Sequence, residues 1–185
     1  MLSKQSMLNE QEIIQQLQQS NTREKAFEQL VREYQETLYW QIRRLVLVHE
    51  DADDVLQNTF IKAWGALDSF RGEARISTWL YRIAINESLN FIEKKRQHIH
   101  LDDSESGLAA MLQSDPYFDG DETQIMLQQA ISQLPEKQRA VFNMKYFDEM
   151  KYEDMSRILK TSVGALKASY HHAVKKITAF FEAHN

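Results

Sequence analysis

The chain has 185 residues, enough for one domain or two small ones, and a formal net charge of −5. It contains no cysteine, which excludes a disulfide framework and a thiolate metal site. Residues 1–19 lack the apolar core of a secretory signal, and no run approaches the roughly 18 apolar residues of a membrane helix. These features predict a cytoplasmic protein without stable membrane insertion.

Turn-forming residues are few, and charge is distributed unevenly along the chain. Only 5 glycines and 2 prolines punctuate the chain, so long helices are favoured over many short strands. Residues 49–68 and 98–123 are strongly acidic, whereas residues 69–97 and 124–185 carry a net positive charge. The chain thus has two basic modules separated by an acidic connector. Such a charge distribution bears on the choice of binding partners and not on the fold.

The first two predicted helices follow from apolar periodicity. Apolar residues recur every three or four positions over residues 22–48, which predicts a core-facing helix. A second helix is predicted over residues 49–67, with Trp64 among its apolar positions. Asp51 or Asp53 is its expected cap, and acidic residues in its first turn suit the helix dipole.

A break separates this helix from a third. Gly72 permits a turn within residues 69–77, where the apolar period lapses. Ser77 or Thr78 is the expected cap of the third helix, which closes on the cations of residues 94–96.

The second half begins with a linker. Residues 98–122 lack Lys and Arg and show no sustained period. Helical patterns resume at residues 123–134, and Pro135 occupies a first helical position of the next helix. Two more helices are predicted at Tyr152–Leu159 and Ser162–Phe181, with Thr161 or Ser162 as the cap between them.

The predicted fold class is therefore all-α. Two small helical domains, residues 22–97 and 123–185, are joined by a flexible acidic linker and preceded by an N-terminal extension at residues 1–21.

The last two helices have helix-turn-helix proportions. On the final helix, the face opposite the apolar stripe carries small residues first and lysines further on, which suits a groove floor and its phosphates. The pattern leaves two alternatives open, duplex DNA binding and a helical interaction module. His171 and His172 diverge by about 100° on a helix, so they cannot chelate as an i, i+4 pair would. No metal or cofactor site is predicted.

The stretch SFRGEARISTWLYRIAIN, residues 69–86, mixes aromatic and basic side chains. Such a mixture fits single-stranded nucleic acid, because bases stack on aromatic and guanidinium faces for about 1–3 kcal/mol each. That stacking could offset part of the cost of unstacking a duplex, itself a few kcal/mol. Burial in a helical core is the alternative for Phe70 and Trp79.

These motifs resemble a known family. Residues 51–64 (DADDVLQNTFIKAW) and 70–86 resemble region 2 of the sigma-70 family, closest to its extracytoplasmic-function (ECF) group. The block LPEKQR, residues 134–139, together with the helix-turn-helix resembles region 4. Both motifs occur in the order and spacing of the two-domain ECF layout, and the likeness covers roughly residues 22–96 and 123–180.

The resemblance implies a sigma factor that supplies promoter recognition and strand opening, with no catalytic residue of its own. Its implied partners are the core RNA polymerase (β′ clamp helices and β subunit), promoter DNA and, as a further candidate, an anti-sigma factor. The positions that match the β′-docking surface are Asp53, Asp54, Gln57, Asn58 and Phe60.

Two further sets of residues match the DNA-contacting positions of the family. For melting the minus-ten element and capturing a flipped base, they are Phe70, Arg71, Arg75, Ser77, Thr78, Trp79, Tyr81, Arg82, Asn86 and Asn90. For reading the minus-thirty-five element, they are Ser162, Gly164, Ala165, Lys167, Ser169, His172 and Lys175.

The chain also departs from the common ECF pattern. Many members carry Arg at the positions of Ser169 and His172, a basic residue at Ile85, Gly at Lys160 and Asp at Asn90. Fewer phosphate contacts are therefore expected from the C-terminal module.

Two other function classes are weighed against a sigma factor. The alternative is a two-domain helix-turn-helix regulator that acts without polymerase. A hydrolase is disfavoured, since the sequence has no phosphate-cradling Gly loop, no H-E-x-x-H helix and no Ser or Cys elbow.

Overall fold

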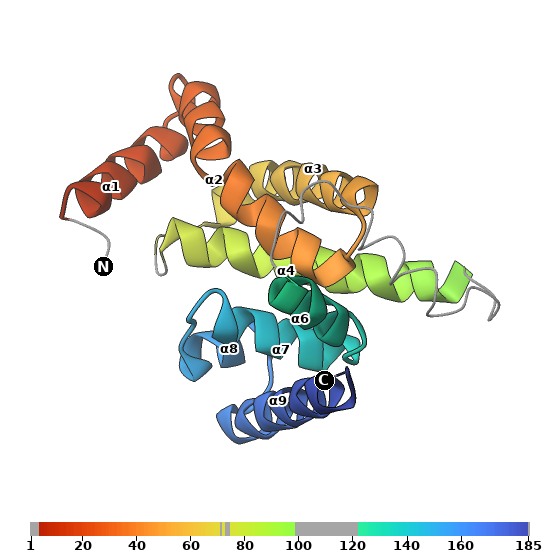
Figure 1. Cartoon of the computed structure of the whole chain (residues 1–185). Helices are drawn as coiled ribbons and strands as arrows, with labels where there is room; N and C mark the ends of the chain where they lie inside the picture. Colours follow the sequence, from red (N-terminus) through yellow and green to blue (C-terminus); the bar gives the residue numbers. More distant parts are fainter. Residues whose placement is uncertain (1–3, 71, 73–74, 99–121, 185) are drawn as a thin grey trace. The chain divides into compact units, whose positions relative to one another are not determined.

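The computed structural model describes residues 4–70, 72, 75–98 and 122–184 (Figure 1). Every regular element in these ranges is a helix, which confirms the predicted all-α class. Contacts divide the chain into two compact units, taken one at a time below: residues 1–43 with 49–90, and residues 44–48 with 91–185. Nearly all of the predicted linker, residues 98–122, lies outside the described residues, so the predicted domain boundaries stay a prediction.

The helices follow the predicted order. Before residue 99 they are α1 (Lys4–Gln18), α2 (Arg23–Val46), α3 (His49–Ala66), the short 3-10 helix η1 (Leu67–Ser69) and α4 (Ile76–His98). After residue 121 they are α6 (Glu122–Ser132), α7 (Glu136–Tyr146), α8 (Tyr152–Leu159) and α9 (Val163–His184). The bounds predicted for α8 are confirmed.

The helix α1 is absent from the prediction, which treats residues 1–21 only as an extension. Ile13 and Leu17 lie one turn apart on α1, and each is only 3% exposed. Their spacing of four was the available signal, but the polar residues around them hide it. The helix contacts η1, so it is an integral part of the first unit.

The core of the first unit is built from the apolar faces of α2, α3 and α4. Phe27 of α2 meets two aromatic rings of α3 edge-on, Phe60 at 6.3 Å and Trp64 at 5.0 Å between centroids. The large side chains that are fully buried in this unit are Leu30, Leu38, Ile42, Val55, Ile76, Leu80 and Ile85.

Two predicted helix caps are wrong. The helix α3 begins at His49, so Asp51 lies in its first turn and neither Asp51 nor Asp53 caps it. The helix α4 begins at Ile76, and the Trp79 N–H donates to the Arg75 carbonyl at 3.1 Å, so Ser77 and Thr78 also lie within a first turn. Burial of Ile76, which is 1% exposed, draws the start of α4 before the two hydroxyl residues.

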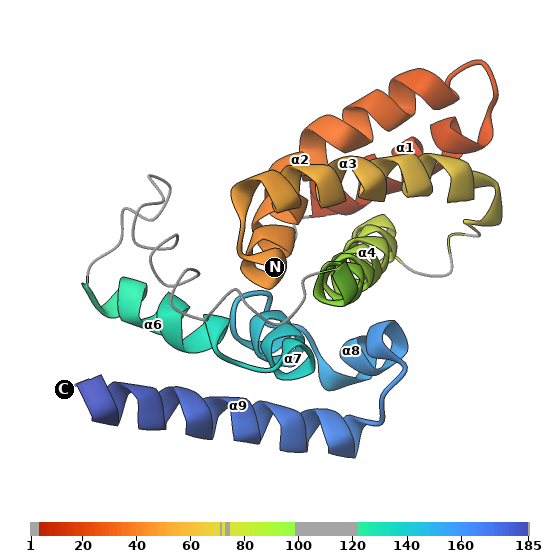
Figure 2. The same ribbon diagram turned by 90° about the vertical axis from the view of Figure 1, so that its right-hand side faces the viewer.

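In the second unit, α9 is the central element, because it contacts α6, α7 and α8 (Figure 2). Its Ala173 and Ile177 share one cluster with residues of α6 and α7. The other buried members of this cluster are Ala130, Ile131, Leu134 and Phe142.

The LPEKQR block ties α6 to α7. Leu134 is 3% exposed, and its N–H donates to the Ile131 carbonyl at 3.1 Å. Pro135 precedes α7 as its N-cap, one residue earlier than predicted. The buried Arg139 guanidinium donates to the Ser132 carbonyl at 3.0 Å, and burial lowers the pKa of Arg139 against the raising effect of nearby Glu136. Arg139 therefore caps the end of α6 from inside the fold.

The turn between α8 and α9 contains a left-handed residue. Lys160 ends α8 with φ 50° and ψ 41°, a conformation that favours glycine because a Cβ crowds the following carbonyl. The next helix has the predicted serine cap, since the Ser162 hydroxyl accepts from the Ala165 N–H at 3.3 Å. The tight turn thus keeps its shape despite a lysine where the family commonly has glycine.

Replacing that lysine should stabilise the second unit. Lys160→Gly is expected to raise its free energy of unfolding by about 1 kcal/mol, because glycine adopts the left-handed conformation without the Cβ clash. Urea unfolding followed by far-UV circular dichroism measures this. Lys151→Gly is the matched control, since Lys151 has an extended backbone with φ −73°, where glycine relieves no Cβ clash. Equal midpoints for the two variants would contradict the prediction.

Candidate polymerase-docking and nucleic-acid interfaces

The predicted docking residues lie on the outer side of α3. Asp53, Asp54, Gln57 and Asn58 are all exposed, whereas Phe60 is half-buried against α2. The Nε2 atom of His49 lies 3.5 Å from the Asp53 carboxylate, one turn along the helix. This face therefore presents polar and acidic groups to a partner.

Two apolar residues of the same face escaped the prediction. Ile61 is 62% exposed and Trp64 is 43% exposed, four and seven positions after Gln57. Residues at these spacings share one side of a helix. Apolar periodicity predicts Trp64 in the core stripe, but its side chain stays 43% exposed although its ring packs on Phe27. An exposed apolar pair beside acidic residues is typical of a protein-docking surface.

The rings of Phe70 and Trp79 pack on each other. Their centroids are 4.9 Å apart with an interplanar angle of 42°, and the two residues are 9% and 6% exposed. In the folded chain both rings are therefore buried in the core, which was the alternative to base stacking. A base could stack on either ring only after the pair separates. Arg71, which belongs to the same predicted site, lies outside the described residues.

The helix α4 keeps a polar stripe on its surface. Arg82, Asn86 and Asn90 are exposed and recur every four residues, so they line one side of the helix. Arg75 is exposed immediately before the helix begins. The remaining predicted residues of this site, Ser77, Thr78 and Tyr81, are half-buried.

Ile85 explains one departure from the family pattern. It is fully buried at 0% exposure, so this position belongs to the core of the first unit. A charged side chain there would be expensive to bury without a partner.

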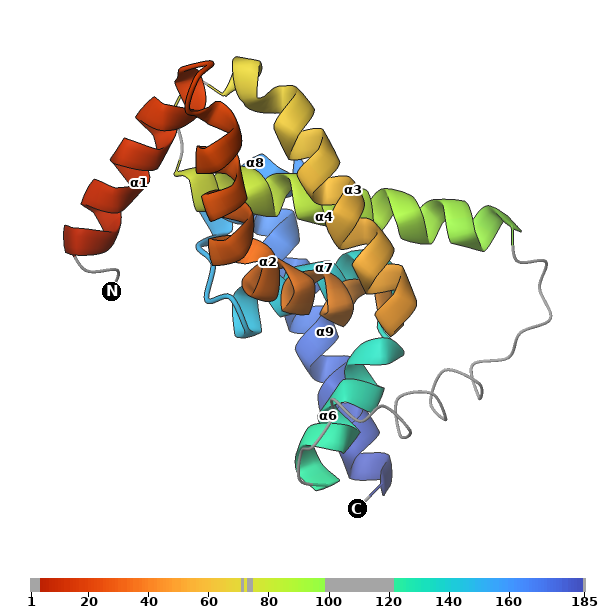
Figure 3. The ribbon, with the colours of Figure 1, turned by 90° about the horizontal axis from the view of Figure 1, so that it is seen from above.

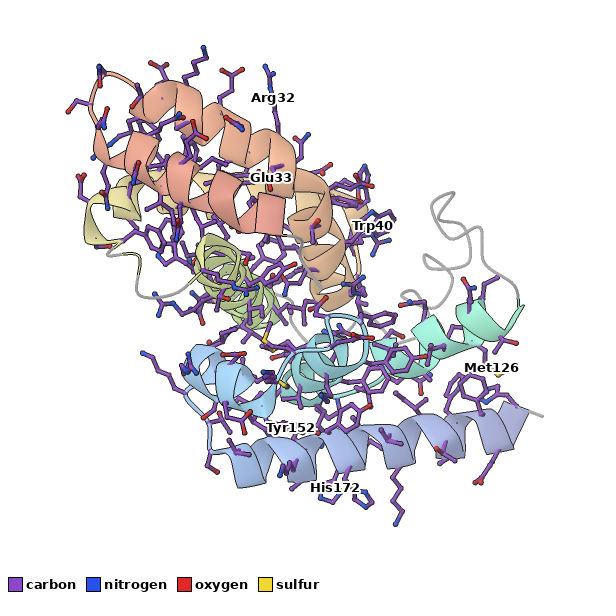
Figure 4. The ribbon with its side chains drawn as sticks, turned by 90° about the vertical axis from the view of Figure 1, so that its left-hand side faces the viewer. Arg32, Glu33, Trp40, Met126, Tyr152 and His172 are labelled. Atoms are coloured by element: carbon purple, nitrogen blue, oxygen red, sulfur yellow. The ribbon has the colours of Figure 1, made fainter. Side chains whose placement is uncertain are left out.

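The predicted minus-thirty-five residues lie at the start and along the outer face of α9. Ser162, Gly164, Ala165 and Lys167 are exposed around its N-terminus, and His172 and Lys175 are exposed further along. In Figure 4, His172 projects from the side of α9 that faces away from α8. Ser169 is half-buried, and the Ser162 hydroxyl is engaged as the helix cap.

Tyr152, at the start of α8, organises two cations near the N-terminal half of α9 (Figure 4). The Lys145 Nζ lies 5.2 Å and the Lys167 Nζ 5.7 Å from the centroid of its ring, both within cation–π range. Lys145 also donates to the Met150 carbonyl at 3.2 Å. Burial raises the pKa of the Tyr152 phenol, and neighbouring Tyr170 adds to this rise.

Two kinds of site are missing from the part of the chain that is described. There, no group of three or more His, Asp or Glu side chains is arranged to hold a metal ion. No helix among the described residues is both long and apolar enough to cross a membrane.

Comparison with known proteins connects both units to one family. The description "Sigma-70 region 2" matches residues 30–98, and "Sigma-70, region 4" matches residues 124–177. The chain is 32% identical to the RNA polymerase sigma-H factor of Pseudomonas aeruginosa, with 91% of each chain covered. It is 33% identical to the ECF RNA polymerase sigma factor SigW of Bacillus subtilis. That match covers 79% of this chain and 83% of SigW.

Solved structures share the fold. The sigma factor RpoE, from its complex with the anti-sigma factor NepR of Bartonella quintana, aligns with a TM-score of 0.69 at 21% identity over 85% of this chain and 98% of that chain. CnrH, in complex with the cytosolic domain of CnrY, aligns with a TM-score of 0.67 at 22% identity over 96% of this chain and 99% of that chain.

The two regions and the full-length relatives decide the class: the chain belongs to the sigma-70 family of RNA polymerase sigma factors, within its ECF group. It confers promoter recognition and strand opening on bacterial RNA polymerase at the initiation of transcription. The alternative, a regulator that acts without polymerase, is not favoured by these relatives.

Burial of the aromatic pair predicts a stability effect. Trp79→Ala is expected to lower the free energy of unfolding by about 3–5 kcal/mol, because it empties a packed site. Ile61→Ala, the control on the exposed face of α3, is expected to cost about 1 kcal/mol or less, because Ile61 is 62% exposed. Urea unfolding monitored by far-UV circular dichroism compares them. Equal losses would show that the Phe70–Trp79 contact does not belong to the core.

Proposed function

We propose that the exposed face of α3 docks this sigma factor on the β′ clamp helices of core polymerase. The single observation that carries the assignment is that Asp53, Asp54, Gln57 and Asn58 are exposed together on one helix of the region 2 match. Ile61 and Trp64 extend this face with apolar surface, which supplies area that polar contacts alone do not. Phe60 supports the face from below.

The minus-ten element is assigned to the residues from Phe70 to Asn90. Exposed Arg75 and Arg82 can follow phosphates, while Asn86 and Asn90 offer hydrogen bonds to an unpaired strand. Ser77, Thr78 and Tyr81 border this stripe, and Arg71 is included by its match to the family motif. Because Phe70 and Trp79 pack together, base capture on these rings requires their contact to open.

The minus-thirty-five element is assigned to α9. Gly164 and Ala165 give its N-terminal end a low profile, which lets the helix approach the floor of the major groove. Lys167 and Lys175 can meet phosphates, and Ser162, Ser169 and His172 supply the remaining polar contacts.

Three further assignments follow from the proposed role. The chemistry of RNA synthesis belongs to the polymerase, and no side chain here acts in catalysis. A cytoplasmic location follows because the protein would act on promoters of the bacterial chromosome. An anti-sigma factor is a candidate partner, since RpoE of Bartonella quintana is held by NepR in a solved complex of the same fold.

Charge reversal on α3 tests docking. Asp54→Lys is expected to weaken binding to purified core polymerase by at least about tenfold, since it opposes the charge pattern of the docking face. Glu182→Lys, an exposed reversal on α9, is the control and should bind as the unchanged chain does. Fluorescence anisotropy of the labelled full chain titrated with core enzyme measures both. Undiminished binding by Asp54→Lys would contradict the docking assignment.

Arginine removal tests strand opening. Arg75→Ala and Arg82→Ala are each expected to reduce open-promoter formation by about 5–10-fold while core binding persists, because each loses a charged contact to the strand. Permanganate reactivity of minus-ten thymines reports opening on a template that the unchanged holoenzyme has selected from a randomised promoter library. Arg32→Ala, on α2, is the control. Full reactivity in both test variants argues against the assignment.

A further inference from the structure

We infer that Arg23 is a positioning residue for promoter opening, because it braces α1 against η1 at the entrance to the minus-ten segment. The inference rests on the proposed role of the segment that begins at Phe70. The region 2 match starts at residue 30, so neither Arg23 nor α1 has a role assigned by it.

The guanidinium of Arg23 joins two elements that are far apart in sequence. Its Nε donates to the Leu17 carbonyl at 3.0 Å, in the last turn of α1. Its terminal amino group donates to the Asp68 carboxylate at 2.6 Å, within η1. Figure 3 shows the α1–α2 turn near the end of α3, where η1 follows. Only a forked donor reaches both acceptors at once, which distinguishes arginine from lysine here.

The turn between α1 and α2 holds Arg23 in place. The Thr22 hydroxyl donates to the Gln16 carbonyl at 2.8 Å, and the Thr22 N–H donates to the Gln19 carbonyl at 3.1 Å. The Arg23 N–H donates to the same Gln19 carbonyl at 2.9 Å. These bonds satisfy terminal carbonyls of α1 and fix the direction in which Arg23 leaves the backbone.

From η1 the constraint passes to the aromatic pair. Leu67 of η1 is 6% exposed, and its carbonyl accepts the Phe70 N–H at 3.1 Å. Phe70 in turn packs on Trp79. If the two rings separate, Trp79 becomes more exposed to solvent. A shift of η1 therefore moves one ring of the Phe70–Trp79 pair relative to the other.

The brace acts on position rather than on overall stability. The Asp68 side chain is 78% exposed, and exposed ion pairs add little to the free energy of unfolding. Arg32 and Glu28 form an exposed pair of the same 2.6 Å length within α2, without any link to η1. Arg32→Ala is therefore a matched control that removes an arginine ion pair and leaves the brace intact.

The first measurement needs no promoter. In the full chain carrying Trp40→Phe and Trp64→Phe, Trp79 is the single tryptophan, and acrylamide quenching reports its exposure. Arg23→Ala and Asp68→Ala should each raise the quenching constant about twofold. The double variant should add nothing more, since each single change already removes the same Arg23–Asp68 pair. Arg23→Lys should fall between, because one ammonium cannot serve both acceptors.

The second measurement uses reconstituted holoenzyme without the Trp→Phe changes. Arg23→Ala and Asp68→Ala should lower permanganate reactivity of minus-ten thymines about threefold, in keeping with an exposed charged pair, while core binding is retained. Arg32→Ala should match the unchanged chain in both measurements. A variant with reduced helix content by circular dichroism is replaced by Arg23→Lys, which keeps the side-chain stem.

The outcomes separate the two levels of the proposal. Quenching in Arg23→Ala that equals quenching in Arg32→Ala overturns the brace. Raised quenching with full permanganate reactivity overturns its link to opening. If the unchanged holoenzyme opens no template at all, the proposed function fails, and the brace is then decided by quenching alone.

Discussion

The contact between Phe70 and Trp79 constrains the part of the first unit that we propose binds the minus-ten element. Phe70 directly follows η1 and Trp79 lies in the first turn of α4, and together the two rings hide surface that would otherwise face water. The folded chain therefore buries the two rings that we propose stack on bases. Opening the pair would cost burial, and stacking on unpaired bases, at about 1–3 kcal/mol per base, would offset part of that cost. The aromatic pair can thus respond to melted DNA without holding the chain to every nucleic acid it meets.

The helix α9 solves a related problem in the second unit with two faces. Ala173 and Ile177 are buried against α6 and α7, while Lys167 and Lys175 remain exposed. The packed side fixes the direction of the helix, so the exposed side, which we propose contacts DNA, has a rigid support. Lys167 gains further order from the ring of Tyr152, which lies at the start of the preceding helix. Helical spacing alone therefore separates the buried side of α9 from the side that we propose recognises DNA.

Helical spacing also explains which elements of the structure could be predicted from the sequence. Strong periodicity predicted α2, α3 and α8, and turn chemistry predicted Ser162 as a cap. Tertiary packing decided the rest. Burial of Ile76 moved the start of α4 ahead of its expected caps, and the position of Phe27 left one side of Trp64 in solvent. Neither effect is encoded within a single helix, since each depends on which neighbour covers which side chain.

The charge pattern completes the argument about partners. Phosphate affinity grows with the number of cations that meet DNA, and the exposed face of α9 brings few of them to the groove. The first unit places acidic groups on α3, where they repel phosphate. A chain with this charge pattern is expected to bind DNA weakly by itself, so promoter affinity would come from its being held beside a second, larger set of contacts. Core polymerase would supply that second set, so the proposed docking through α3 would be a precondition for the proposed DNA contacts of α4 and α9.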